Sequence, residues 1–409
     1  MRIAVANWTS GVFGGVESYI ATLAGALSGQ GHDLILFTEQ GAPVERPESA
    51  PAGGNIGVIN VAESGRSEAI ALLSRWHPDI VYVHQILDPE LEALLGGIAP
   101  SVLFVHSYAG ACISGRKTTS FPTMRACHRT FGAKCLLHYY PHRCGGWSPV
   151  TMASLFAVQK RRSALMRSYD LVLTQSEYMR REMSRYMNED FLRTLALPTG
   201  DIIDPTRSRI WRKGEPVRLL FAGRMEDLKG GDLLLEALLL LDPGIAQSME
   251  VTFAGAGSLR EKWERKASQI MRLRPDVRIR FSGWLNDEAK AEAYRTHDLL
   301  VVPSIWPEPF GLVGIEAGSL GLPAAAFNVG GIPEWLHDGV SGHLAEADPA
   351  TAKSLSSAIE RCFESEAHYA ILSAGARTIA ARHGIDVHSA RLIEMFDEVI
   401  ARRRNEAAS

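Results

Sequence analysis

Two acids and two cations in the second half of the chain could act on a sugar and a phosphate. Glu308 and Glu316 are eight residues apart, and the segment Phe310–Leu312 between them would present backbone N–H groups at a helix N-terminus. Arg224 and Lys229 are five residues apart, and glycine flanks both. Two cations and a helix N-terminus around one point can bind a diphosphate. Singly, each of these residues is more often a solvated surface charge, but the combination favours a diphosphate site.

The surrounding sequence predicts strands and helices that would position these residues. Residues 299–304 are typical of a short buried strand ended by proline, and 312–320 of a helix stopped by Gly321 and Pro323. Residues 217–221 predict a strand before Arg224, and 230–241 a helix. Further strands are expected at 251–253, 278–282 and 323–327. Alternating strands and helices indicate a parallel, doubly wound α/β sheet.

The first half of the chain repeats this alternation. A strand at 2–7, a glycine-rich loop ending at Gly15, a helix at 16–27 and a strand at 34–37 form one unit. Additional buried strands are expected at 79–83, 102–105 and 171–174. His106 follows one of these strands, which favours a place in a cleft, whereas His84 is expected to be a core histidine.

The length of 409 residues allows two domains with separate cores. The expected divisions are an N-terminal domain over 1–200 with a Cys-rich insertion at about 106–146, a linker over 201–215, a second domain over 216–385, and a C-terminal helix over 386–409. That last helix carries an apolar stripe, so it must pack on another part of the protein.

Composition restricts the class of protein. Hydrophobic residues make up 46% of the chain and charged residues 22%, as in soluble globular proteins. We find neither a bilayer-spanning apolar stretch nor a signal peptide, so a cytoplasmic location is expected.

The net charge of −3 conceals a strongly basic segment. Residues 115–185 contain thirteen Lys or Arg and only three acids, whereas the first 114 residues contain four basic and eleven acidic residues. The segment suggests an anionic partner, namely a phosphorylated substrate, an acidic glycan or a lipid head-group layer, with peripheral association at the inner membrane face left open. A solvated helix face is the alternative for 160–162. Nucleic acid is not expected, because the domain as a whole is not basic.

The chain resembles glycosyltransferase family 4, whose members are retaining, nucleotide-sugar-dependent enzymes with the GT-B fold. The segments that carry the resemblance are Gly14-Gly15-Val16-Glu17, Val105-His106, Phe221-Ala222-Gly223-Arg224, Lys229-Gly230, Pro303-Ser304, Glu308-Pro309-Phe310-Gly311 through Glu316, and Gly330-Gly331-Ile332-Pro333-Glu334. The resemblance implies two Rossmann-like domains that face each other across a cleft, with the C-terminal helix crossing back to the N-terminal domain.

The resemblance also implies a role for individual residues. Arg224 and Lys229 would hold the diphosphate of the donor, and Glu316 would accept hydrogen bonds from the ribose hydroxyls. Glu308 would face the transferred sugar as a catalytic residue. The remaining donor-binding positions implied are the backbone groups of Phe310, Gly311 and Leu312, together with Gly15 beside the phosphates and Gly283 beside the base. His106 would lie near the sugar and the acceptor as a second catalytic residue.

The implied reaction moves a sugar from a nucleoside diphosphate, with UDP or GDP expected, to a hydroxyl acceptor in glycan, glycolipid or glycosylated metabolite biosynthesis. With Arg224 and Lys229 in place, and no DxD-type acidic pair in a suitable loop, catalysis should need no metal cofactor. A sugar-nucleotide epimerase or hydrolase and a non-catalytic nucleotide-sugar-binding subunit stay open as alternatives. A two-Rossmann dehydrogenase is excluded, because residues 11–15 do not form G-x-G-x-x-G.

Four of the five cysteines lie in the insertion, at Cys112, Cys127, Cys135 and Cys144. Ordinary thiols, a structural zinc or iron–sulfur site, and disulfides are three explanations that the sequence leaves open. No C-x2-C pair occurs, so the spacing is not that of a common zinc finger.

Overall fold

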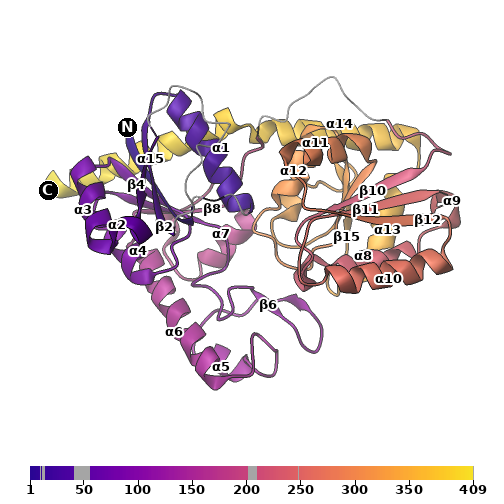
Figure 1. The fold of residues 1–409 in the computed structure, drawn as a ribbon, viewed down its shortest axis with the longest axis horizontal. Helices are drawn as coiled ribbons and strands as arrows, with labels where there is room; N and C mark the ends of the chain where they lie inside the picture. Colours follow the sequence, from indigo (N-terminus) through magenta and orange to yellow (C-terminus); the bar gives the residue numbers. More distant parts are fainter. Residues whose placement is uncertain (10, 12–13, 41–55, 201–209, 247, 409) are drawn as a thin grey trace. The chain divides into compact units, whose positions relative to one another are not determined.

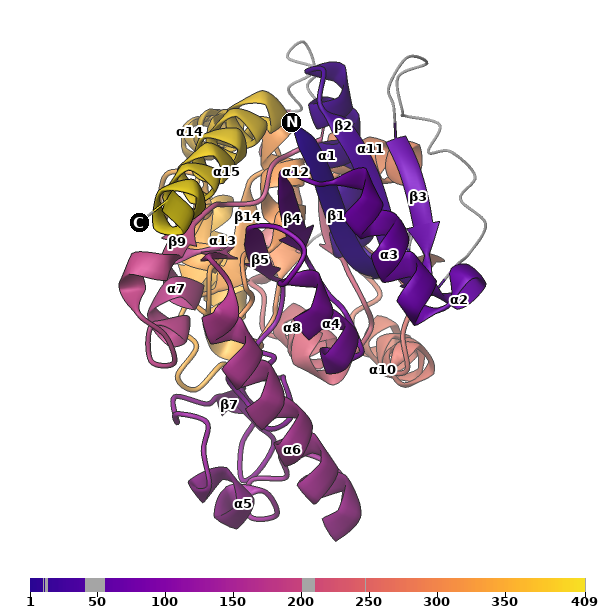
Figure 2. The same cartoon turned by 90° about the vertical axis from the view of Figure 1, so that its left-hand side faces the viewer.

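The computed structural model describes residues 1–9, 11, 14–40, 56–200, 210–246 and 248–408. The chain divides into two compact units, each built on a parallel sheet. Figures 1 and 2 show the ribbon in two views that differ by a turn of 90°. Unit 1 comprises Met1–Lys117, His128–Pro198 and Ile385–Ser409, and unit 2 comprises Thr118–Cys127 and Thr199–Gly384. The expected linker at 201–215 lies largely outside the described residues.

Unit 1 contains a seven-stranded sheet in the order β3-β2-β1-β4-β5-β8-β9. Its strands are β1 (Arg2–Thr9), β2 (Asp33–Gln40), β3 (Ile56–Asn60), β4 (Ile80–Val83), β5 (Ser101–Val105), β8 (Leu171–Thr174) and β9 (Leu192–Thr194). Its helices are α1 (Gly15–Gly29), α2 (Val61–Ser64), α3 (Arg66–Trp76), α4 (Pro89–Leu95), α5 (Lys134–His138), α6 (Pro149–Leu165), α7 (Glu177–Met183) and α15 (Ile385–Ala408). All strand pairs are parallel, so the residues that follow β4, β5 and β8 meet at one edge of the sheet.

Unit 2 contains a six-stranded parallel sheet in the order β12-β11-β10-β13-β14-β15. Its strands are β10 (Val217–Ala222), β11 (Met249–Ala254), β12 (Val277–Gly283), β13 (Leu299–Val302), β14 (Ala324–Phe327) and β15 (Gly342–Ala345). Its helices are α8 (Gly231–Leu238), α9 (Pro243–Ala246), α10 (Arg260–Leu273), α11 (Asp287–Thr296), α12 (Leu312–Ser319), α13 (Ala352–Cys362) and α14 (Glu366–Ala380).

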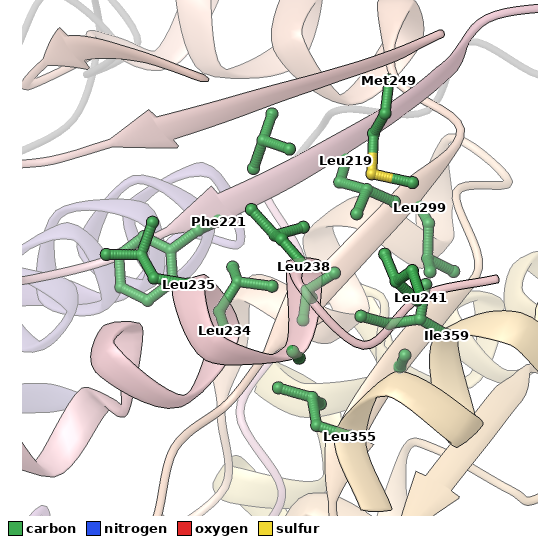
Figure 3. Close-up of a cluster of buried hydrophobic side chains, with 14 of the residues drawn as sticks. Leu219, Phe221, Leu234, Leu235, Leu238, Leu241, Met249, Leu299, Leu355 and Ile359 are labelled. Atoms are coloured by element: carbon green, nitrogen blue, oxygen red, sulfur yellow. The ribbon is translucent and has the colours of Figure 1, made fainter. Parts of the chain in front are cut away.

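The core of unit 2 fixes the strand that leads to the predicted diphosphate site. Leu219 and Phe221 of β10 pack with Leu234 of α8 and Ile359 of α13, and Figure 3 shows these side chains converging between the helices and the sheet. Burying one such side chain stabilises the fold by about 1.5–3 kcal/mol. Because β10 and α8 share this core, the loop between them is held at both ends.

The C-terminal helix α15 belongs to unit 1, which confirms that it crosses back to the N-terminal part of the chain. Its apolar stripe is buried there, and the ring of Phe396 lies 5.2 Å from that of Tyr82 in β4. Gln30, just after α1, donates a hydrogen bond to Ser389. The stripe detected in the sequence therefore has its partner, and α15 runs beside α1 in Figure 1.

The insertion expected within the N-terminal domain is shared between the units. The short antiparallel pair β6 (Thr118–Thr119) and β7 (Arg125–Ala126) is grouped with unit 2. The physical reason is that Met124 packs against the hydrophobic core of unit 2. The rest of the insertion, including α5, lies in unit 1.

Candidate active site

In unit 2 the loop that carries Arg224 is positioned by glycines in the next loop of the sheet. A Cβ on Gly255 would lie 2.0 Å from the carbonyl oxygen of Gly223, and one on Gly257 would lie 2.4 Å from that of Met225. Backbone hydrogen bonds also join the two loops. Sequence analysis did not identify Gly255 and Gly257 as part of the site. The structure shows that their missing side chains allow this close approach, which fixes the backbone around Arg224.

The two predicted cations differ in their surroundings. Arg224 is exposed and makes no side-chain hydrogen bond or ion pair with the described residues. Lys229 is half-buried, and its Nζ lies 2.5 Å from Oε1 of Glu308 and 5.3 Å from the ring centroid of Trp306. Gly230 has a positive φ of 68°, and a Cβ there would lie 1.8 Å from the carbonyl oxygen of Pro303. The loop after β13 therefore sets the position of Lys229.

Glu308 is buried, with 5% of its surface exposed. Oε1 accepts hydrogen bonds from Lys229 and, at 2.7 Å, from the hydroxyl of Ser304. The glycines after β14 hold its backbone, because the N–H of Gly331 donates to its carbonyl at 2.7 Å and a Cβ on Gly330 would collide with its N at 2.4 Å. The structure thus brings Glu308, predicted to face the sugar, into direct contact with Lys229, predicted to hold the diphosphate.

The segment Phe310–Leu312 forms the start of α12, as the sequence predicted. Gly311 caps the helix with a φ of 100°, in the left-handed region that favours glycine. The Phe310 side chain is fully buried, and its carbonyl accepts a 2.7 Å hydrogen bond from the indole N–H of Trp335. The backbone at this helix N-terminus is therefore held from both sides.

Glu316 lies on α12, and two residues of α11 bind its carboxylate. Lys290 Nζ lies 3.0 Å from Oε1, and the hydroxyl of Tyr294 donates to Oε2 at 2.9 Å. Burial and then the charge of Glu316 raise the pKa of Tyr294, which keeps its proton available for donation. Burial opposes the charge of Lys290, but Glu316 and Asp287 outweigh it and raise the pKa of this lysine. Sequence reasoning missed Lys290 and Tyr294 and predicted no helix there, although their i, i+4 spacing would place them on one face of a helix.

Gly283 ends β12 with a φ of 78°. Its carbonyl accepts a 2.7 Å hydrogen bond from the N–H of Gly255, so it adjoins the same loop that supports Gly223. The next residue, Trp284, is 62% exposed. These three strand-end loops place Gly283 and Arg224 on the same edge of the unit 2 sheet.

In unit 1 the predicted residues are Gly15 and His106. Gly15 is the first residue of α1, and a Cβ there would meet nothing within 4 Å in the described part of the chain. The packing of the described residues therefore does not itself require a glycine at this position. Val12 and Phe13 of the same loop lie outside the described residues.

His106 lies in a buried neutral network at the edge of the unit 1 sheet. Its Nε2 lies 2.9 Å from Nδ1 of His84, and its Nδ1 lies 2.8 Å from Nε2 of Gln175. The Gln175 amide is a donor, so His106 accepts on Nδ1 and carries its proton on Nε2, which then donates to His84. Burial lowers the pKa of His106 to about 3. Burial, together with the nearby His106 and His388, lowers that of His84.

The network continues through two tyrosines to the C-terminal helix. The hydroxyl of Tyr19 lies 3.0 Å from that of Tyr82 and 2.8 Å from Nε2 of His388. The Nδ1 of His388 lies 2.8 Å from the carbonyl oxygen of Ala196. His84 is buried as expected for a core histidine, but its contact with His106 was not expected. Sequence analysis did not identify Tyr19, Tyr82, Gln175 or His388 as members of this network.

The four cysteines of the insertion are free thiols in the structure, as is Cys362. Within the described ranges, no group of three or more His, Cys, Asp or Glu could hold a metal ion. The structure therefore does not bring Cys112, Cys127, Cys135 and Cys144 together as ligands. The reason is that these residues are spread over the buried start of the insertion, β7 with its flank, α5 and the loop after it.

Two family models match the chain in turn. Residues 13–195 match the model described as Glycosyltransferase Family 4, and residues 204–379 match the model described as Glycosyl transferases group 1. The first covers most of unit 1 and the second most of unit 2.

Curated relatives match part of the chain. A D-inositol 3-phosphate glycosyltransferase of Geodermatophilus obscurus is 35% identical over 219 residues, which are 48% of this chain and 45% of that relative. A D-inositol 3-phosphate glycosyltransferase 1 of Catenulispora acidiphila is 34% identical over 205 residues, or 48% of each chain. The similarity thus spans about half the length of the curated relatives.

Solved structures match nearly the whole chain in fold. HepE of Anabaena in complex with UDP and glucose has a TM-score of 0.68 at 16% identity, covering 97% of this chain and 100% of that one. WaaG, a glycosyltransferase involved in lipopolysaccharide biosynthesis, has a TM-score of 0.65 at 17% identity, covering 96% of this chain and 99% of that one. The architecture of two Rossmann-like units is therefore the GT-B fold, and the chain belongs to the glycosyltransferases of family 4 type, with a group 1 domain in its second half.

Proposed function

We propose that this protein transfers a sugar from a nucleoside diphosphate to a hydroxyl acceptor, with retention of anomeric configuration. The observation that carries the proposal is the ion pair between Lys229 and Glu308, which are 79 residues apart in the chain. It joins Lys229, which we expect to hold the diphosphate, to Glu308, which we expect to face the sugar, and this contact supports one shared site for both. Arg224, in the loop after β10, and Glu316, on α12, belong to the same unit.

The chemistry follows from the charge that develops during transfer. As the bond between the anomeric carbon and the diphosphate oxygen breaks, its electron pair moves onto the diphosphate. Arg224 and Lys229 would stabilise that charge, and preorganised groups of this kind contribute several kcal/mol. The acceptor oxygen would form the new bond on the same face, and its proton would pass to the departing diphosphate oxygen. Lys229 would exchange part of its contact with Glu308 for a phosphate oxygen.

Arg224 and Lys229 would supply the positive charge that a metal ion supplies elsewhere, so we propose that transfer needs no metal cofactor. The expected donor nucleotide is UDP or GDP, and Glu316, held by Lys290 and Tyr294, would accept hydrogen bonds from its ribose. Binding of UDP by HepE, a protein of the same fold, supports the choice of UDP.

The acceptor that we propose is a phosphorylated or otherwise anionic alcohol, and the product a glycan, glycolipid or glycosylated metabolite. Two observations support this. The relatives named above are glycosyltransferases that take inositol 3-phosphate by name, and residues 115–185 of this chain carry thirteen basic residues against three acidic ones. The five free thiols suit a reducing compartment, so we also propose a cytoplasmic location, which cell fractionation would test.

The test begins with donor binding. In a thermal-shift panel of UDP-, GDP-, ADP- and TDP-sugars, one donor at a hundred times its dissociation constant should stabilise the fold by about 2.7 kcal/mol. Incubation of that donor with phosphorylated and unphosphorylated alcohols should then yield a glycoside with the anomeric configuration of the donor.

Two alternatives predict other products. An epimerase or hydrolase would convert the donor without any acceptor, and a non-catalytic subunit would bind the donor without turnover. Either result under the same conditions would contradict the proposal. Nuclear magnetic resonance of the donor-only reaction separates these cases.

A further inference from the structure

The most unusual surface of unit 1 lies outside the candidate site. From residue 93 to residue 169 the chain contains ten Lys or Arg and no Asp or Glu. Residues 128–168, which we name the acid-free lobe, contain α5, the loop after it and α6. In Figures 1 and 2, α5 lies beside one end of α6, away from the unit 1 sheet.

The base of the lobe is attached firmly to the rest of unit 1. Arg162 near the end of α6 donates to the carbonyls of Ile86 and Leu87 at 2.8 and 2.9 Å, and contacts Glu92 at 3.4 Å. Arg161 reaches Glu90 at 3.3 Å. These two cations therefore serve attachment, and the free surface lies at the opposite end of α6.

The far end of the lobe exposes large apolar side chains. Leu137 on α5 is 76% exposed, Trp147 before α6 is 71% exposed, and Val150 in its first turn is 78% exposed. The Trp147 ring stacks on Tyr140 with centroids 6.1 Å apart, and the guanidinium of Arg143 lies 5.9 Å from its centroid. Exposed apolar side chains that gather within a short segment, as these three do between residues 137 and 150, favour an interaction surface over single scattered exposures.

The lobe also carries exposed cations, since Arg143 lies near the Trp147 ring, Lys134 is the first residue of α5, and Arg129 precedes that helix. Apolar tips flanked by tryptophan, tyrosine and arginine are suited to the boundary between lipid head groups and acyl chains. The aliphatic tips of Leu137 and Val150 cannot stack on bases, which favours a bilayer over a nucleic acid. No described helix combines the length and the apolar character needed to cross a bilayer, so any contact of the described part with lipid would be at the surface.

We propose that the acid-free lobe binds the surface of a bilayer that contains anionic lipid, with Leu137, Trp147 and Val150 entering the head-group boundary. Arg129, Lys134 and Arg143 then lie against the lipid phosphates. The lobe contains none of the candidate site residues, which are Arg224 and Glu308 in unit 2 and His106 in unit 1, so the proposal does not depend on the proposed function. It assigns the lobe a partner of defined chemistry, an anionic phospholipid.

The experiment measures sedimentation of the full chain with vesicles of phosphatidylcholine, with or without phosphatidylglycerol. The wild type should bind only the anionic vesicles, and a rise to half-molar salt should weaken binding, because screening acts over about 8 Å at physiological ionic strength. The variants Trp147→Ser with Val150→Ser, and Lys134→Glu with Arg143→Glu, should each weaken binding by about tenfold or more.

Matched controls are available on α10 of unit 2. Leu273 is 71% exposed, like Trp147, and Arg272 is an exposed cation. Leu273→Ser and Arg272→Glu should leave vesicle binding unchanged, and circular dichroism should show every variant folded. Equal binding of neutral and anionic vesicles, unchanged binding by the lobe variants, or binding of RNA in place of vesicles would overturn the proposal.

Discussion

The predicted site residues of the two units are held by different physical means. In unit 2, Glu308 and Glu316 are buried acids paired with Lys229 and Lys290, and a glycine-dependent loop contact fixes the backbone of Glu308. In unit 1, His106 belongs to a network of histidine, tyrosine and glutamine, and no ion pair joins it among the described residues. A charged site can exchange its internal ion pairs for a charged ligand. A neutral network keeps its geometry and its protonation state over a wide range of pH.

The largest effect should come from the charged site. Arg224→Ala should lower kcat of sugar transfer by about two orders of magnitude, because a preorganised cation at the leaving group is lost. Steady-state kinetics with the donor identified by thermal shift measures this effect. Arg272→Ala, at an exposed position on α10, is the matched control and should have wild-type kinetics. Loss of less than threefold in Arg224→Ala would mean that the arginine does not contact the diphosphate.

Substitution of the two acids of unit 2 should have different effects on nucleotide binding and on turnover. Glu316→Gln should weaken binding of the bare nucleoside diphosphate by about tenfold, since one charged acceptor for the ribose is lost. Glu308→Gln should leave that binding within about threefold and lower kcat by about tenfold. Calorimetry with the nucleotide and kinetics with the sugar donor measure the two effects. Equal losses of nucleotide affinity in both variants would contradict the assignment of their roles.

The neutral network should appear in the pH dependence of stability. Burial lowers the pKa of His106 to about 3 and also lowers the pKa of His84. Between these lowered pKa values and the ordinary histidine pKa of about 6.5, the unfolded chain therefore binds more protons than the folded protein. The free energy of unfolding should therefore fall as pH drops below about 6.5, by at most about 1.4 kcal/mol per pH unit for each histidine.

Denaturant unfolding at pH 7, 6 and 5 tests this slope. His84→Gln should make the slope smaller by roughly 1 kcal/mol per pH unit, because one of the buried histidines is gone. His77→Gln, on an exposed histidine after α3, should keep the wild-type slope. Identical slopes in the wild type and in His84→Gln would show that His84 does not titrate on unfolding.

The smallest effect concerns metal. EDTA should change kcat by less than about twofold, since two cationic side chains are available to stabilise the leaving group. Zinc and iron analysis of the purified protein is an independent measurement on the four thiols of the insertion. A large loss of turnover with EDTA, restored by one divalent metal, would contradict metal-independent transfer.

The sequence by itself determined the class of fold and the short motifs that hold the candidate site residues of unit 2. Strand and helix periodicity there is local, and Arg224, Lys229, Glu308 and Glu316 lie in short contiguous motifs whose spacing limits their positions. Glycines in the sequence also indicate where the backbone turns. A backbone φ near 100°, as at Gly311, strongly favours glycine over other residues. These signals need no knowledge of distant contacts.

Only the tertiary structure decided the partners of those residues. The contact of Lys229 with Glu308, the support of Gly223 by Gly255, and the bonding of His106 to His84 join segments far apart in the chain. It also separated the cysteines of the insertion and assigned the segment 118–127 to unit 2 through Met124. The physical reason is that side-chain pairing and core packing depend on the positions of whole strands and helices. Local propensity and spacing describe those elements one at a time.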